Sequence, residues 1–122
     1  MVEHDQGALF LKLLRQCAAC DFRLERRPEN MATLAQLGMT VRDAHDRIIS
    51  LKPSDYVEGP TPRKSNPSQG AWVFGLNLQG VSVYVKVSIR LEPARCVCVS
   101  FHEAERPMAF PYCEDKRKGS DR

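Results

Sequence analysis

The segment from Val81 to Glu92 constrains the fold more than any other part of the sequence, because its apolar and polar residues alternate without interruption. The odd positions hold valine, isoleucine or leucine, and the even positions hold polar or charged residues. A period of two places these sets on opposite faces of a β-strand. A strand with one apolar and one polar face is typical of an antiparallel sheet that packs on one side only.

Two further strands are expected on either side of this segment. Residues 72–78 read as a strand that a tight turn at Gln79–Gly80 connects to residue 81, and residues 96–101 read as a third strand after a turn at 92–95. We therefore expect a three-stranded antiparallel meander over residues 71–102. Its apolar face should bury the following residues: Val83, Val85, Val87, Val99 and Phe101.

The first half of the chain has helical patterns. Residues 8–20 carry an apolar stripe at helical spacing, and a second helix should be capped by Asn30 and end before Gly38. The segment Thr40–Asp43 has the spacing of an acidic capping box, so a third helix should begin there and stop before Pro53. The sequence thus predicts an α+β fold with N-terminal helices packed on a small sheet.

The remaining segments read as irregular. Residues 23–28 are charged and end in proline, which favours a connector or a short edge strand. Residues 53–70 are rich in proline, glycine and serine and should form a long loop. The polar stretch 114–122 contains no apolar residue and is expected to be a disordered tail, which leaves residues 1–113 as one domain.

Composition narrows the function classes. The chain has 122 residues, 43% of them hydrophobic and 27% charged, which suits one soluble globular core and no membrane span. Because the first residues lack the basic region of a secretory signal, we expect a cytoplasmic location. The net charge of +3 is compatible with a nucleic-acid partner but does not require one.

The cysteines allow two interpretations. Cys17 and Cys20 have zinc-ligand spacing, and Cys96 and Cys98 would complete a set of four thiolates. However, Cys17 lies on the apolar stripe of the first helix, and Cys96 and Cys98 alternate with valines as strand residues do. Packing as buried free thiols is the simpler explanation, so we expect neither a metal nor a cofactor.

The polar face of the meander is the place where chemistry is expected. Continued alternation on the third strand sends three residues inward (Val97, Val99 and Phe101) and four to the polar side (Cys96, Cys98, Ser100 and His102). A turn centred near residue 93 pairs Lys86 with Ser100 and Tyr84 with His102. Such a face would bring together a cation, a phenol and an imidazole.

Those three groups match the needs of ribonuclease chemistry. A base removes the 2′-hydroxyl proton, a cation stabilises the charged phosphorane, and an acid protonates the leaving 5′-oxygen. Tyr84, Lys86 and His102 are therefore the candidate catalytic residues. Arg63 and Lys64 in the predicted loop, with Arg90 and Ser100 on the sheet, are candidates for binding substrate. The alternative is that each of these residues is an ordinary solvated surface group and that the loop is a plain connector.

Several segments resemble the motility quorum-sensing regulator (MqsR) family of toxins. They are residues 37–56, the strand Val83–Val87 with its Tyr-Val-Lys core, and the strand end Val99–Phe101. A subgroup assigned to that family is resembled by residues 72–75, 100–105, 107–108 and 110–112. The resemblance extends from about residue 9 to residue 112.

The resemblance implies a RelE-like fold and a toxin of a type II toxin–antitoxin system. Its activity would be cleavage of messenger RNA as an mRNA interferase, and its partner would be a cognate antitoxin. Tyr84 and Lys86 fall on matching family positions, and His102 stands where the family has a lysine. Glu58 replaces a functional lysine of the family, and Val73 lies near the position of a glutamine. These two departures leave open a second reading, a non-catalytic protein- or RNA-binding module.

Overall fold

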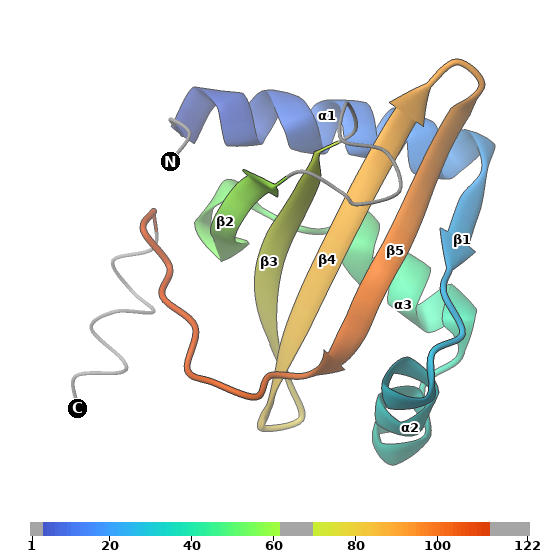
Figure 1. Ribbon diagram of the computed structural model, residues 1–122, viewed down its shortest axis with the longest axis vertical. Helices are drawn as coiled ribbons and strands as arrows, with labels where there is room; N and C mark the ends of the chain where they lie inside the picture. Colours follow the sequence, from blue (N-terminus) through green and yellow to red (C-terminus); the bar gives the residue numbers. More distant parts are fainter. Residues whose placement is uncertain (1–3, 62–69, 113–122) are drawn as a thin grey trace.

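In the computed structural model, which describes residues 4–61 and 70–112, three helices pack against a five-stranded mixed sheet (Figure 1). The strand order is β1-β5-β4-β3-β2. In the view of Figure 1, α1 and α3 lie behind the sheet and α2 lies beside the lower part of β5. The expected α+β class is confirmed. The opposite sheet face, turned toward the viewer, carries no helix among the described residues and is called the open face below.

The predicted meander is present. It consists of β3 (Ala71–Leu78), β4 (Val81–Leu91) and β5 (Ala94–Glu103), each antiparallel to the next. The five residues expected to be buried are at most 5% exposed: Val83, Val85, Val87, Val99 and Phe101. The alternation in the sequence of β4 therefore predicts correctly which face of this strand packs against the helices.

The long loop predicted over residues 53–70 is wrong in its first part. A 3₁₀ turn, η1 (Pro53–Asp55), leads into an edge strand, β2 (Tyr56–Thr61), which pairs antiparallel with β3. Tyr56 anchors this strand because its ring is buried and packs at 5.9 Å from Trp72 between ring centroids. The second of two register shifts, between Glu58 and Thr61, spans Gly59 and Pro60, and an edge strand tolerates proline because one row of its amides needs no partner strand. Residues 62–69 lie outside the described part.

The helices agree with the prediction except at their starts. Helix α1 (His4–Cys20) begins earlier than residue 8. Helix α2 (Pro28–Leu37) begins with proline at its first turn, where no amide partner is needed, and ends at Gly38 in the left-handed conformation. Helix α3 (Val41–Ile49) has the predicted capping box. In that box, the Thr40 amide donates to Asp43 at 2.8 Å and the Asp43 amide donates to the Thr40 hydroxyl at 3.1 Å.

The charged segment 23–28 overlaps a short edge strand, one of the two alternatives that the sequence allowed. Strand β1 (Phe22–Leu24) pairs parallel with the first part of β5. Flanking it, the Cys96 amide donates to the Asp21 carbonyl at 2.8 Å, and the Glu25 amide donates to the Cys98 carbonyl at 2.9 Å. Beyond Glu25 the chain turns into α2, so β1 covers only half of this edge of β5.

A β-bulge at Val99 changes which face the first half of β5 presents. Lys86 is opposite Ser100, but its neighbour Val87 is opposite Cys98, so β5 has one extra residue there. The prediction that Cys96 and Cys98 lie on the polar face, with Val97 inward, is therefore wrong. Both thiols are fully buried in the core, and Val97 lies opposite Ser88 on the open face. After the bulge the predicted pairs Lys86–Ser100 and Tyr84–His102 are confirmed.

The side chain of Asn30 stabilises the bulge. Asn30 is fully buried within α2, so the prediction that it caps this helix is wrong. Its amide nitrogen donates to the carbonyls of Glu25 at 2.8 Å and Val99 at 3.1 Å, and its amide oxygen accepts from the Phe101 amide at 2.9 Å. One turn later, Thr33 accepts from the Glu103 amide at 3.1 Å. Side chains of α2 thus satisfy the edge of β5 where no strand does.

We predict that Asn30→Ala lowers the free energy of unfolding by about 3 kcal/mol, because each buried backbone group left without a partner costs roughly 1–3 kcal/mol. Urea denaturation followed by circular dichroism measures this change. Gln36→Ala, at an exposed position of the same helix, is the control and should change the free energy by less than about 0.5 kcal/mol. Equal effects of the two substitutions would show that Asn30 does not hold the edge of β5.

Candidate functional site

The centre of the open face is a stacked pair of rings from adjacent strands. Tyr84 of β4 lies directly opposite His102 of β5, with ring centroids 5.4 Å apart and ring planes 19° from parallel. Both side chains are half-buried. The pair exists because of the bulge: without the extra residue, Phe101 would lie opposite Tyr84 and His102 would point into the core.

The histidine ring is oriented by the backbone. Its Nδ1 lies 3.0 Å from the carbonyl oxygen of Glu103. A carbonyl can only accept, so Nδ1 carries the hydrogen and donates it. In the neutral imidazole this leaves the lone pair on Nε2, which is the tautomer a general base requires.

Tyr84 is held in its protonated form. Burial of the ring is the main cause that raises the pKa of its phenol above the ordinary value, and the nearby carboxylate of Glu58 raises the pKa further. The phenol is thus a hydrogen-bond and proton donor throughout the physiological pH range. Glu58 reaches the open face from β2, where it lies opposite Val73.

Lys86 supplies a positive charge beside the ring pair. It follows Tyr84 by two residues on β4, which is about 7 Å along the same face. Its neighbours across the strands are Val73 and Ser100, both buried. Within residues 4–61 and 70–112 the half-buried Lys86 side chain forms no ion pair, so its charge can act on a ligand.

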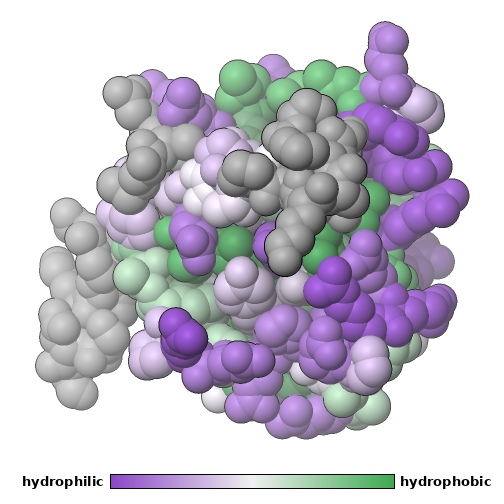
Figure 2. All heavy atoms as spheres, in the orientation of Figure 1, coloured by the Kyte–Doolittle hydropathy of each residue, from purple (hydrophilic) through white to green (hydrophobic). Residues whose placement is uncertain are grey.

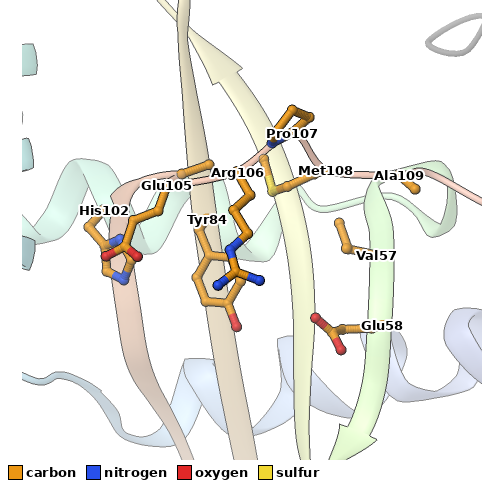
Figure 3. A pocket seen from close by; sticks show the side chains of 10 residues that line it. Val57, Glu58, Tyr84, His102, Glu105, Arg106, Pro107, Met108 and Ala109 are labelled. Atoms are coloured by element: carbon orange, nitrogen blue, oxygen red, sulfur yellow. The ribbon is translucent and has the colours of Figure 1, made fainter.

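A pocket of about 630 Å³ opens next to Tyr84 and His102. Its outer wall is formed by residues 104–109 of the segment 104–112, which leaves β5 and crosses toward β2 (Figure 1). Figure 3 shows Glu105 and Arg106 extending from this segment on the side of His102 and Tyr84, while Glu58 faces the pocket from β2. The pocket is lined by these residues: Val57, Glu58, Tyr84, His102, Ala104, Glu105, Arg106, Pro107, Met108 and Ala109.

Gly75 allows the segment to lie close to the sheet. It faces the open side of β3 opposite Tyr84, and a methyl group in its place would lie 2.7 Å from the Phe110 ring and 2.9 Å from Met108 Cε. Beyond Phe110, Tyr112 reaches Tyr56 of β2 with ring centroids 5.5 Å apart. The segment that forms the outer wall of the pocket therefore packs closely on Gly75, which has no side chain.

The other candidate residues are more dispersed. Ser100 is beside Lys86 but only 5% exposed, so its hydroxyl is not presented to solvent. Arg90 is on the same face four residues further along β4 and does not join the ring pair. Arg63 and Lys64 lie outside the described residues.

The cysteines form no evident metal centre in the described part of the chain, where no group of three or more histidine, cysteine or acidic side chains is placed to hold a metal. Cys17, Cys96 and Cys98 are buried free thiols, as expected, whereas Cys20 is exposed at the end of α1. Burial raises the pKa of the Cys96 thiol to about 12, and the neighbouring Cys17 adds to that rise. Cys113 lies outside the described residues.

Sequence reasoning missed most of the pocket wall. It gave no role to Arg106 or Met108, because an irregular segment has no periodicity to interpret. One signal was present: a glycine inside a strand pattern marks close approach of other chain segments, and Gly75 has that property.

The fold and site define a small α+β protein with a Tyr–His–Lys face. The chain matches no protein-family model and no curated protein. Among the described residues, no helix is both long and apolar enough to cross a membrane.

We predict that Gly75→Ala displaces the C-terminal segment without unfolding the sheet, since the atoms in the way are the ends of the Phe110 and Met108 side chains. Hydrogen exchange by mass spectrometry should show faster exchange over residues 104–112 and unchanged protection in β4. Gly7→Ala is the control, because a methyl group there meets nothing within 4 Å. Unchanged exchange in the Gly75 variant would contradict this packing.

We predict that Glu58→Gln lowers the pKa of Tyr84, because it removes the negative charge that opposes phenolate formation. The pKa should remain above the ordinary value, since burial is the larger cause. Alkaline absorbance titration, with Tyr84→Phe to assign the signal, measures the change. Glu29→Gln on α2 is the matched control, and a pKa of Tyr84 that stays fixed in both variants would refute the assigned role of Glu58.

Proposed function

We propose that the protein is an endoribonuclease of the toxin type that cleaves messenger RNA by attack of the RNA's own 2′-hydroxyl. The observation that carries the proposal is the stacking of Tyr84 on His102 with Lys86 two residues away on the same open face. Base, acid and cation are the groups that this reaction needs.

Each group has a distinct role in the proposed reaction. His102 Nε2 accepts the 2′-hydroxyl proton while the 2′-oxygen forms a bond to phosphorus. The Lys86 ammonium stabilises the charge of the phosphorane. The bond from phosphorus to the 5′-oxygen then breaks, and the Tyr84 phenol protonates that oxygen. The products are a 2′,3′-cyclic phosphate and a 5′-hydroxyl, and solvent returns both catalytic groups to their starting forms.

The pocket provides a place for a nucleoside next to the scissile phosphate. Its volume lies within the range of small-molecule sites. Met108, Pro107 and Val57 offer apolar contacts to a base, and Glu58 and Glu105 offer acceptors for its amino groups. The pocket would therefore position the nucleotide whose 2′-hydroxyl faces His102.

The resemblance to MqsR-type toxins supports the same proposal from the sequence. It adds a RelE-like fold, a cytoplasmic site of action on messenger RNA and an antitoxin that neutralises the protein. Tyr84 and Lys86 occupy matching positions, and the imidazole of His102 takes the place of a basic residue.

A second candidate function is binding without cleavage. The observation that favours it is the carboxylate of Glu58 close to Tyr84, which replaces a family lysine with a charge that repels phosphate. In that case the open face docks RNA or a protein, and the ring pair is a stacking surface.

We predict that His102→Ala and Lys86→Ala each lower the rate of cleavage of free RNA by about 10²–10⁴-fold, the usual contribution of a catalytic acid or base. Gel analysis of a labelled RNA incubated with purified protein measures the rates, and circular dichroism checks the fold. Lys12→Ala, exposed on α1, is the matched lysine control and should cleave at the parental rate.

Two outcomes would count against the proposal. Retention of the parental rate by both site variants would contradict the assignment of the site. No cleavage by the parent, combined with binding of RNA that depends on Tyr84 and His102, would favour the binding module.

A further inference from the structure

Three arginines gather on the open face at the end of the sheet near the β4–β5 turn. Arg90 of β4 lies directly opposite Arg95 of β5, and Arg23 of β1 lies opposite Val97, the next residue of β5 on this face. Hydrophilic side chains dominate the right-hand part of this face, over β1 and β5 (Figure 2). We call Arg23, Arg90 and Arg95 the arginine cluster.

The cluster has more positive than negative charge. Asp21 is the carboxylate that contacts it within the described chain, at 2.6 Å from Arg95 Nε and 3.8 Å from Arg23 Nε. Among the residues that the structure describes, Arg90 has no such contact, and its buried Nε has no hydrogen-bond partner. Like charges directly opposite each other on neighbouring strands are destabilising, and so is an unpaired buried donor. An anion bound at the guanidinium group of Arg90 would offset the first of these costs, the repulsion between Arg90 and Arg95.

The position of the arginine cluster relative to the ring pair indicates which kind of anion binds there. Arg90 follows Lys86 by four residues on the same face of β4, which is about 14 Å. Tyr84, Lys86 and Arg90 follow one another along the same face of β4. An extended single strand of RNA presents successive phosphates along such a line, and guanidinium groups bind phosphate with two parallel hydrogen bonds.

We infer that the arginine cluster is a second phosphate subsite, which binds a phosphodiester of the same RNA strand about two nucleotides from the one beside Lys86. The RNA then runs along β4 from the pocket toward the β4–β5 turn. The choice of RNA as the source of the phosphate rests on the proposed function. Arg90 is the central residue of the subsite, because the Nε of Arg95 is already engaged by Asp21.

The test measures binding of 2′-O-methyl oligoribonucleotides, which cannot be cleaved through the 2′-oxygen, by fluorescence anisotropy at several salt concentrations. Parental protein should bind more tightly as the oligonucleotide is lengthened until it reaches both phosphates. Arg90→Gln should lose about 10-fold in affinity for the long oligonucleotide and little for the short one. The slope of log affinity against log salt should fall by about 0.7, the value for one phosphate contact in a single strand.

Two further variants sharpen the result. Arg90→Lys keeps the charge, so the salt slope should stay parental while the affinity falls with loss of the two parallel hydrogen bonds. Arg42→Gln, exposed on α3, is the matched control and should bind as the parent does. An Arg90→Gln variant with parental affinity and slope would overturn the inference, and so would Arg90-dependent binding of inorganic phosphate with no Arg90 effect on the oligonucleotide.

The inference and the proposed function fail in different ways. If cleavage depends on His102 but oligonucleotide binding does not depend on Arg90, the inferred phosphate subsite is wrong and the proposed endoribonuclease function stands. If oligonucleotide binding depends on Arg90 but the protein cleaves no RNA, the phosphate subsite stands and the proposed endoribonuclease function is wrong.

Discussion

The buried amide of Asn30 is the interaction on which the arrangement of the open face depends. It joins α2 to the backbone of β5 on both sides of the bulge at Val99. That bulge shifts the alternation of β5 by one residue, so Cys96 and Cys98 enter the core while Ser100 and His102 share a face with Lys86 and Tyr84. A polar side chain in the core thus determines which polar groups meet on the surface. Asn30 and Val99, whose carbonyl it binds, are 69 residues apart in the sequence.

Charge on the open face is divided between two ends of the sheet. Around the ring pair, the carboxylates of Glu58 and Glu105 oppose the positive charges of Lys86 and Arg106. Burial, with a smaller contribution from Glu58, raises the pKa of the Tyr84 phenol. Near the β4–β5 turn, Asp21 only partly offsets the arginine cluster. A polyanion bound at the arginines would extend along β4 to the pocket, where the opposite charges are closer to balanced. Under the proposals above, the arginine cluster contributes affinity for RNA, and the residues around the ring pair contribute the chemistry.

The sequence predicted the meander because it follows from local rules, whereas the predicted Tyr84–His102 pair is met only because the bulge shifts the second half of β5 by one residue. Alternation in 81–92 identifies the faces of β4, and the turn after Leu91 sets the register of β5. The bulge was not predictable in this way, since its cause is a side chain on a distant helix. Strand β2 was missed because Gly59 and Pro60 disrupt its pattern, and an edge position with register shifts tolerates them. The pocket wall was missed because residues 104–112 have no regular structure whose period could reveal them.

The most direct test of the account is the chemical identity of the ends that the purified protein leaves on a defined RNA. Mass spectrometry of the products distinguishes the alternatives. Attack by the 2′-hydroxyl predicts a 2′,3′-cyclic phosphate, or the 3′-phosphate formed from it by hydrolysis, together with a 5′-hydroxyl. Products with a 3′-hydroxyl and a 5′-phosphate would mean that water attacks phosphorus, and the roles given to His102 and Tyr84 would be wrong.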